Sequence, residues 1–272
     1  MRTARALATT GALLLVAALV FPYYWTAVSS LVTEARLFEA PSLFPTDPTL
    51  AHYHALLVER RFWLPMRNSL VVAGSSTLLC MVLGSLCAYA LARLEFRGKA
   101  PLLALVLAVS MFPQISIVSP LFLLLRWAGL VDSYPGLVLP YLTFAMPLTV
   151  WLLVGYFRQL PRELEEAAMV DGASRLRALW EVVLPLSLPG LATTAILTFI
   201  YCWNEFLFAL SFTTGPEHQT APVAIALLRG RYQVPWGQTL AATVVATLPV
   251  VLLVLAFQRW IVRGLTAGGV KE

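Results

Sequence analysis

Four polar residues in the apolar part of this chain are candidates for contact with a polar ligand. Trp203, Asn204 and Glu205 stand in a row at the end of one apolar stretch, and Gln114 stands in another. An ionisable residue such as Glu205 is costly deep inside a membrane unless it faces water or a partner. Successive helical residues point about 100° apart, so at most one or two of the three consecutive residues can face one path. These residues either line a polar path or brace a helix bundle by hydrogen bonds between helices.

The charged segment 158–188, which separates two apolar stretches, is a second candidate site. It begins with acidic residues that suit the first turns of a helix: Glu163, Glu165 and Glu166. Gly172 suits the position that ends this helix, and Ser174 can cap a second short helix that Pro185 stops. The first helix has a face of small and apolar residues: Leu164, Ala167, Ala168 and Val170. Such a face favours docking on another protein; the alternative is an amphipathic helix lying on a membrane surface.

Six long apolar runs must position these residues. Asp, Glu, Lys and Arg are absent from residues 6–33, 68–92, 100–125, 133–157, 182–204 and 232–258. Each run exceeds the length of about 20 residues with which a helix crosses a bilayer core of about 30 Å. Charged residues make up only 12% of the chain, about half the usual share in soluble proteins. The sequence therefore predicts an all-α membrane protein with six transmembrane helices, the third over 102–125 and the fifth over 189–212.

The distribution of basic residues predicts the orientation of these helices. With a cytosolic N-terminus, the inside segments hold twelve of the nineteen Lys and Arg residues. Because cytosolic loops carry an excess of Lys and Arg, we expect both termini in the cytosol. Arg2 and Arg5 could open a signal peptide, but the apolar run that follows is too long for one. We therefore expect the first helix to be retained.

The sequence offers little for catalysis or metal binding. It has no phosphate-binding loop of the Walker type, no His-Glu-x-x-His pair and no nucleophile elbow. His52 and His54 are an isolated pair in an external segment, and we expect them to be solvated. The three cysteines lie in apolar runs, where they behave as small hydrophobic residues: Cys80, Cys87 and Cys202. We therefore expect no enzymatic activity, no metal site, no cofactor and no nucleic-acid partner.

The spacing from Glu166-Ala167-Ala168 through Gly172 to Leu184-Pro185 resembles the EAA loop of ABC importer permeases. Other likenesses to that family are Arg67-Asn68-Ser69, Ala88-Tyr89-Ala90-Leu91-Ala92-Arg93, Trp203-Asn204-Glu205-Phe206 and the tail 264–271. The resemblance covers nearly the whole chain. It is to the carbohydrate-uptake branch, and within it to the smaller permease of a maltose/trehalose-type importer. At position 205 the family often has Asp, so Glu205 keeps the acid but lengthens its reach.

This resemblance implies a type I permease fold in the plasma (inner) membrane. The first helix and external segment would take residues 1–67, and the importer domain residues 68–272 with the EAA loop at 161–189. The loop would hold a cytosolic coupling helix that docks on an ATPase subunit through Glu163, Leu164, Glu166, Ala167, Ala168, Asp171, Gly172 and Pro185. The implied partners are a second permease, two ATPase subunits, an external sugar-binding protein and membrane lipid.

The resemblance also implies a function: ATP-driven import of a sugar, with a disaccharide such as trehalose or maltose as the best guess. Gln114, Trp203, Asn204 and Glu205 would then line the sugar path. The external loop 213–238 would reach the binding protein, with Arg229, Arg231 and Trp236 as contacts. An ion-coupled secondary sugar carrier with Glu205 as its ionisable site is the alternative, but it leaves the EAA loop unexplained. A membrane-embedded enzyme would need paired acids or an activated nucleophile, which the apolar runs lack.

Overall fold

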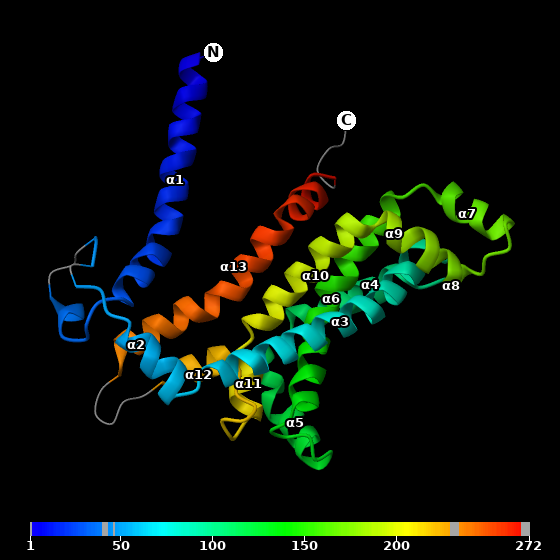
Figure 1. The fold of residues 1–272 in the computed structure, drawn as a ribbon. Coiled ribbons are helices and arrows are strands. Elements are labelled where there is room, and N and C mark those ends of the chain that lie inside the picture. The colour runs from blue at the N-terminus through cyan, green and yellow to red at the C-terminus, as the bar shows by residue number, and fades with distance from the viewer. Residues whose placement is uncertain (1, 40–42, 46, 229–233, 268–272) are drawn as a thin grey trace. The chain divides into compact units, whose positions relative to one another are not determined.

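A computed structural model describes residues 2–39, 43–45, 47–228 and 234–267, and these form helices joined by turns, with no strand among them (Figure 1). Four helices in this part of the chain are long and apolar enough to cross a membrane: α1 (Arg2–Ser29), α3 (Trp63–Arg93), α6 (Tyr134–Gln159) and α13 (Trp236–Ala267). Two further pairs of helices meet these criteria jointly but are sharply bent, which brings the possible spans to six. The all-α class predicted from the sequence is confirmed.

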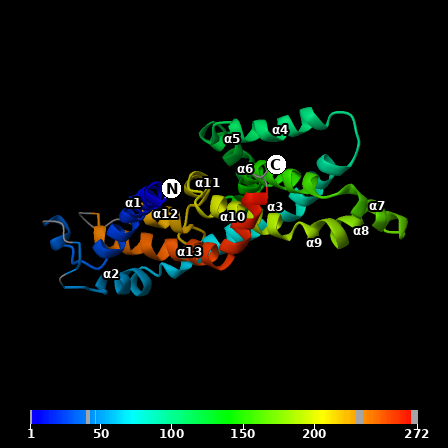
Figure 2. The ribbon, with the colours of Figure 1, turned by 90° about the horizontal axis from the view of Figure 1, so that it is seen from above.

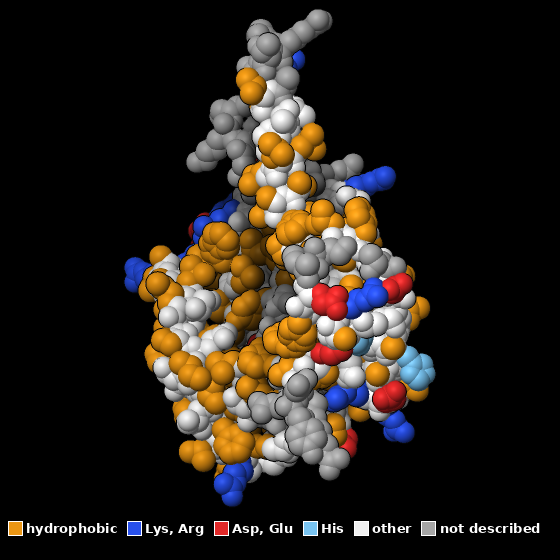
Figure 3. All heavy atoms as spheres, turned by 90° about the vertical axis from the view of Figure 1, so that its left-hand side faces the viewer, with side chains coloured by type: hydrophobic (Ala, Val, Ile, Leu, Met, Phe, Trp, Pro, Cys, Tyr) orange, Lys and Arg blue, Asp and Glu red, His pale blue; other side chains and the backbone are white. Residues whose placement is uncertain are grey.

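The chain forms two compact units, which we describe separately. One contains residues 1–64 and 224–249, and the other contains residues 65–223 and 250–272. The first unit thus combines α1 and the segment that follows it with the beginning of α13. Hydrophobic side chains dominate the surface seen in Figure 3, and acidic and basic groups form only small clusters there. Such a surface suits contact with lipid or with other apolar helices.

In the first unit, polar contacts fix the beginning of α13. The carboxylate of Glu34 accepts hydrogen bonds from the backbone N–H groups of Trp236, at 2.8 Å, and Gly237, at 3.0 Å. The ring of His52 lies against Gly237, where a Cβ atom would come within 2.2 Å of the ring. The same ring makes a 2.9 Å hydrogen bond with the carbonyl of Val32. An acid at the N-terminus of a helix satisfies free N–H groups there. His52 lies in the short helix α2 (Ala51–His54), which continues into the π-turn Ala55–Glu59.

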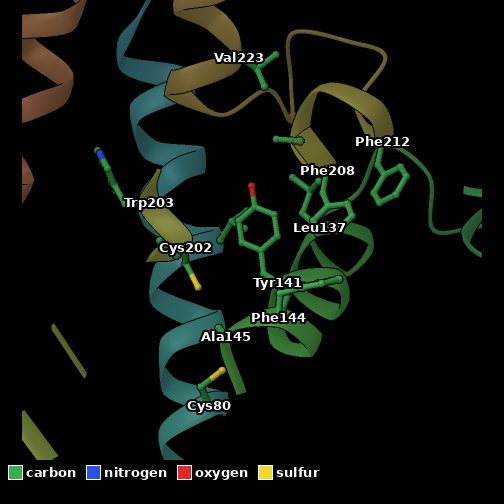
Figure 4. Close-up of a cluster of buried hydrophobic side chains, with 14 of the residues drawn as sticks. Cys80, Leu137, Tyr141, Phe144, Ala145, Cys202, Trp203, Phe208, Phe212 and Val223 are labelled. Carbon is green, nitrogen blue, oxygen red and sulfur yellow. The ribbon is translucent and has the colours of Figure 1, made fainter. Parts of the chain in front are cut away.

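In the second unit, α6 packs against α10 (Leu188–Trp203), and side chains of α3 and α6 share two buried clusters. Helices α3 and α6 approach closely because Gly84 has no side chain; a Cβ atom there would lie 2.8 Å from a methyl group of Thr149. The hydroxyl of Thr149 also makes a 2.9 Å hydrogen bond with that of Thr198 on α10. Small residues and hydroxyl bonds of this kind hold helices together where lipid removes the usual hydrophobic driving force. A cluster of buried side chains, shown in Figure 4, includes Cys80, Tyr141, Phe144, Cys202, Trp203 and Phe208.

The third predicted helix is broken. The structure divides it into α4 (Lys99–Met111) and α5 (Gln114–Trp127), which are bent by 93° relative to each other. Pro113 has no N–H to donate, and it restricts Phe112 to the extended conformation that residue adopts. Pro120, by contrast, lies inside α5.

The fifth predicted helix is also shorter than expected over 189–212. Helix α10 ends at Trp203, and a separate helix α11 (Leu207–Phe212) follows after three residues. At its other end, the chain bends by 83° between α9 (Leu184–Leu186) and α10. Glu205 therefore lies at a break between two helices and not within a continuous one.

Candidate functional site

Two short helices with a sharp turn between them form the charged segment, as the sequence predicts. Helix α7 (Arg162–Val170) ends at Asp171, and Gly172 follows with a φ of +90°. The N–H groups of Gly172 and Ala173 donate to the carbonyls of Met169 and Ala168, which is the Schellman arrangement. Ser174 caps α8 (Arg175–Ala178) by accepting a 3.3 Å hydrogen bond from the N–H of Arg177. Glycine adopts the positive φ without strain, so Gly172 fixes the angle between the helices.

A buried polar cluster attaches α7 to the end of α3. The carboxylate of Glu165 accepts a hydrogen bond from the hydroxyl of Tyr89, and its Oε2 lies 3.3 Å from Nε of Arg93. The same guanidinium donates to the carbonyl of Leu160 at 2.9 Å. Glu165 and Arg93 are both buried. Since a buried charge requires a partner, these contacts fix the position of α7 on the helix bundle.

The rest of the segment is anchored by apolar packing. Helix α8 continues through a π-turn, Leu179–Val183, into α9. Ala178, Leu179 and Val183 are buried, and the last two pack against side chains of α3 and α6. Figures 1 and 2 show α7 and α8 together at one end of this unit. Pro185 does not stop the helix as expected: it lies inside α9, two residues after the π-turn, and the break comes at Ser187.

Most of the predicted coupling residues are exposed on this anchored segment. The exposed members are Glu163, Leu164, Glu166, Ala167, Asp171, Gly172 and Pro185, and Ala168 is half-buried. Val170, the last residue of α7, is 87% exposed. Beside it lies a pocket of about 460 Å³ lined by Arg93, Glu95, Arg162, Glu166 and Arg175, among others. The segment therefore presents acidic and apolar groups to its surroundings on a rigid attachment, which suits it to bind another protein.

The polar residues that the sequence singled out meet at a second pocket, of about 470 Å³. It is lined by Gln114, Ile200, Tyr201, Asn204, Glu205, Phe206 and Leu207. The side-chain amide of Gln114 donates a 2.7 Å hydrogen bond to the hydroxyl of Tyr201. Trp203 does not line this pocket; it is buried in the cluster of Figure 4 and stacks on Phe199. Tyr201 was missed by the sequence analysis, because its contact with Gln114 depends on the break at Pro113.

The carboxylate of Glu205 has a clear local role. Its two oxygens accept hydrogen bonds from the backbone N–H groups of Phe208, at 2.8 Å, and Ala209, at 3.2 Å. These N–H groups belong to the first turn of α11 and have no partner within the helix. Glu205 therefore caps α11, and this cap accounts for both the helix break and the buried acid.

The loop between α11 and α13 is described only in part, and Arg229 and Arg231, expected as contacts, lie outside the described residues. Trp236 is half exposed, at 50%, and begins α13. In the second unit, the buried Asn68 donates from Nδ2 to the carbonyls of Glu217, at 2.7 Å, and Gln219, at 3.0 Å. The hydroxyl of Ser69 accepts from the N–H of Ala221 at 2.8 Å. The loop that leads to α12 (Ala221–Ala226) is thus tied to the beginning of α3.

Metal-binding and redox groups are sparse in the structure. Among the described residues, no three His, Cys, Asp or Glu side chains lie close enough together to hold a metal ion. The cysteines are free thiols: Cys80, Cys87 and Cys202.

Comparisons with known proteins agree with this architecture. Residues 81–267 match the family described as binding-protein-dependent transport system inner membrane component. The chain is 43% identical to the trehalose/maltose transport system permease protein MalG of Thermococcus litoralis, over 98% of this chain and 97% of that protein. It is 44% identical to the sulfoquinovosyl glycerol transport system permease protein SmoH of Agrobacterium fabrum, over 92% of this chain and 88% of that protein.

A solved structure shows the same fold. It is the crystal structure of a bacterial ABC transporter involved in the import of the acidic polysaccharide alginate, with a TM-score of 0.79. The match covers 95% of this chain and 98% of that chain at 23% identity. The chain therefore belongs to the family of binding-protein-dependent transport system inner membrane components and has the type I permease fold of ABC importers.

Proposed function

We propose that this chain is a permease subunit of an ATP-driven importer that carries a sugar into the cytosol. The two relatives are transport proteins for trehalose/maltose and for sulfoquinovosyl glycerol, and the matching structure belongs to an alginate importer. The relative that matches over 98% of the chain favours a disaccharide with glucose units, trehalose or maltose. The near-equal identity of the sulfoquinovosyl glycerol relative means that the sugar must be decided by experiment.

The anchored segment 162–186 is the observation that carries this proposal. Its exposed surface would dock on an ATPase subunit, and Glu165, buried against Arg93, would transmit force from α7 to the helix bundle. A displacement of α7 then moves α3, because the two are joined by charged and hydrogen-bonded contacts. The chain would work with a second permease, two ATPase subunits and an external sugar-binding protein. ATP binding and the loaded binding protein would bias the bundle between inward-open and outward-open states.

The subunit itself would catalyse nothing and would carry no cofactor. ATP hydrolysis would belong to the ATPase partners, and lipid would surround the exposed apolar helices. We further propose that both termini face the cytosol, because this orientation puts the coupling segment on the side where ATP is available. The excess of Lys and Arg in the segments on that side supports it.

The ion-coupled carrier remains the competing proposal, and the geometry of Glu205 weakens it. A carrier needs an acid that binds and releases an ion during transport. Both oxygens of Glu205 are instead engaged with the first turn of α11. A structural cap explains this buried acid without ion coupling.

Uptake into proteoliposomes distinguishes the two proposals. The chain, purified with the proteins encoded beside its gene, should take up radiolabelled trehalose or maltose only when ATP is present on the ATPase side. Uptake should persist when the proton gradient is collapsed. The double variant Ala168→Arg, Gly172→Ile should insert normally but lose uptake. Uptake that continues without ATP and disappears with the proton gradient would refute the proposed function.

A further inference from the structure

A polar cluster in the second unit ties the segment 213–221 to the turn between α5 and α6. Asp132 lies in that turn, and its backbone N–H donates to the carbonyl of Phe212 at 2.9 Å. Its carboxylate accepts hydrogen bonds from the backbone N–H of Thr214, at 3.3 Å, and from the hydroxyl of Thr214, at 3.1 Å. Asp132 has a φ of +56°, in a region that Asp and Asn enter more readily than most residues. The turn therefore presents an acid to the beginning of the segment.

The ring of His218 lies in the same cluster with one nitrogen unsatisfied. Its Nδ1 lies 3.5 Å from Oδ1 of Asp132. This nitrogen is shielded from solvent and makes no hydrogen bond within the part of the chain that the structure describes. A neutral imidazole carries a proton on only one of its two nitrogens, whereas the imidazolium carries one on both. Protonation of the ring therefore guarantees a donor at Nδ1, directed at a carboxylate.

The backbone on both sides of His218 is fixed independently of the ring. The side-chain amide of Asn68 donates to the carbonyls of Glu217 and Gln219, the two neighbours of His218 in the chain. The same amide accepts a hydrogen bond from the hydroxyl of Tyr134. The rings of Tyr134 and His218 meet edge to face, with 5.0 Å between their centroids. These contacts keep the imidazole beside the carboxylate whether or not it is charged.

The charged groups around the imidazole favour its protonated form. The carboxylate of Glu217 adds to that of Asp132: a Cβ atom at Gly215 would lie 2.6 Å from Oε2 of Glu217 and 3.4 Å from Oδ2 of Asp132. Two carboxylates beside the same glycine repel each other, and a cation next to them offsets this repulsion. The guanidinium of Arg67 also reaches the cluster, where it donates to the hydroxyl of Tyr134 at 3.1 Å. A positive charge on the imidazole would therefore stabilise the folded cluster.

We propose that His218 is a protonation-controlled latch: its imidazolium donates from Nδ1 to Asp132 and holds the segment 213–221, which loosens when the ring is neutral. Histidine ordinarily changes its charge between about pH 5 and 8. Because the folded cluster favours the charged form, the stabilisation is present at acidic pH and is lost as the pH rises through this range. The inference rests on the proposed function in one respect. The segment belongs to the loop that we expect to meet the external binding protein, so the latch would make that contact depend on the pH outside.

Amide hydrogen exchange of the complete transporter in nanodiscs tests the latch without an assay of transport. Exchange of the segment 213–221 would be followed by mass spectrometry at about pH 5.5 and about pH 8, on either side of the usual titration of histidine. Each variant is compared with the wild type at the same pH, which cancels the effect of pH on the chemistry of exchange. In His218→Gln the segment should exchange about three- to tenfold faster than in the wild type at the lower pH, between the value of an exposed ion pair and that of a buried charged hydrogen bond. At the higher pH the two rates should be close.

A second variant removes the charge on the other side of the latch. Asn, like Asp, tolerates the positive φ of position 132, and its amide can still form hydrogen bonds with Thr214. Asp132→Asn should therefore keep the turn but remove the difference between the two pH values, as His218→Gln does. His54→Gln is the matched control. Nδ1 of His54 lies 3.9 Å from Oε1 of Glu59, but both side chains are exposed and belong to the first unit. In this control the segment 213–221 should respond to pH as in the wild type.

The pattern across the two pH values decides whether the charge of His218 matters. If His218→Gln accelerates exchange equally at both pH values, the ring acts by packing alone and the latch is refuted. Wild-type exchange rates in both Asp132→Asn and His218→Gln at the lower pH would refute it as well. A pH response that disappears in both variants and persists in His54→Gln supports it.

Stimulated ATP hydrolysis separates this inference from the proposed function. The concentration of loaded binding protein needed for half-maximal hydrolysis should be about threefold higher in His218→Gln than in the wild type at the lower pH, and equal at the higher pH. If exchange shows the latch but this concentration does not change, the latch stands and the expected contact between the loop and the binding protein is wrong. Absence of ATP-dependent import by the wild type would refute the proposed function, whereas the exchange experiment would still decide on the latch.

Discussion

Nε of Arg93, the last residue of α3, lies 3.3 Å from Oε2 of Glu165 in α7, and both side chains are buried. The two residues are 72 positions apart; Arg93 belongs to the helix bundle and Glu165 to the anchored segment 162–186. Tyr89 donates a hydrogen bond to the same carboxylate one turn earlier in α3. A helix held only by exposed contacts would move independently of the bundle. This buried pair makes the first turn of α7 part of the bundle.

Removal of Glu165 should detach α7. Glu165→Ala leaves the Arg93 guanidinium buried without its counter-charge, and breaking a buried pair in this way costs about 3–5 kcal/mol. In Glu165→Ala, we expect residues 162–178 to become at least tenfold more sensitive to limited proteolysis. We also expect sugar uptake to fall. Glu163→Ala is the matched control, because Glu163 is exposed on the same helix. Equal proteolysis rates in the two variants would contradict the role of Glu165 in attaching α7 to the bundle.

Substitution of Gly172 tests the angle between α7 and α8. A Cβ atom at this position meets no other atom within 4 Å, so any effect arises from the φ of +90° and not from a clash. Gly172→Ile places a β-branched residue in the left-handed region and should cost about 1–3 kcal/mol. Gly172→Asn, which tolerates this region, should be nearly silent. Uptake and stimulated ATP hydrolysis in vesicles measure the effect, and equal loss in both variants would show that the φ angle is not what matters.

Helices α7 and α8 can be predicted from the sequence because their signals are local. The acidic first turns of α7, the glycine at its end and the Ser174 cap are each recognisable from adjacent residues, and all three are present. The buried contact that attaches α7 to α3 cannot be predicted in this way. Glu165 looks like any acidic residue in a first helical turn, and only the folded chain places it beside Arg93 and Tyr89.

The helix breaks show where reasoning from hydropathy fails. The apolar runs give no sign of an interruption, because a break depends on hydrogen bonding and not on polarity. Proline alone does not predict a break: the helix is interrupted at Pro113, but Pro140 and Pro147 lie within the unbroken α6. At Glu205 the break depends on a carboxylate that turns back to cap the next helix, and apolar patterning cannot predict such a contact. The convergence of Gln114 with Asn204 and Glu205 at one pocket follows from these breaks.

Cysteine labelling tests the orientation. In a variant whose three native cysteines are replaced by alanine, Ala128→Cys and Thr214→Cys should react with an impermeant thiol reagent applied to intact cells. Both positions are exposed and lie near Asp132, in segments that we place outside. Ser174→Cys, equally exposed but in the coupling segment, should react only after the cells are opened. Labelling of position 174 in intact cells would reverse the proposed topology.

Asn68 should control how the external loop responds to the binding protein. Its amide group donates to the carbonyls of Glu217 and Gln219 and accepts from the hydroxyl of Tyr134 at 2.8 Å. Because Asn68 is fully buried, Asn68→Ala leaves these groups without partners, at a cost of about 1–3 kcal/mol. We expect the loop 213–221 to loosen and the concentration of loaded binding protein needed for half-maximal ATP hydrolysis to rise several-fold.

The maximal rate of hydrolysis in Asn68→Ala should stay near the wild-type value, since the coupling segment is untouched. Tyr134→Phe provides a graded comparison: it removes the hydroxyl that bonds to Asn68 but keeps both amide bonds to the loop. Its effect on half-maximal stimulation should therefore be smaller than that of Asn68→Ala. If Asn68→Ala lowers the maximal rate of ATP hydrolysis but leaves the half-maximal concentration of binding protein unchanged, Asn68 stabilises the bundle and does not position the loop.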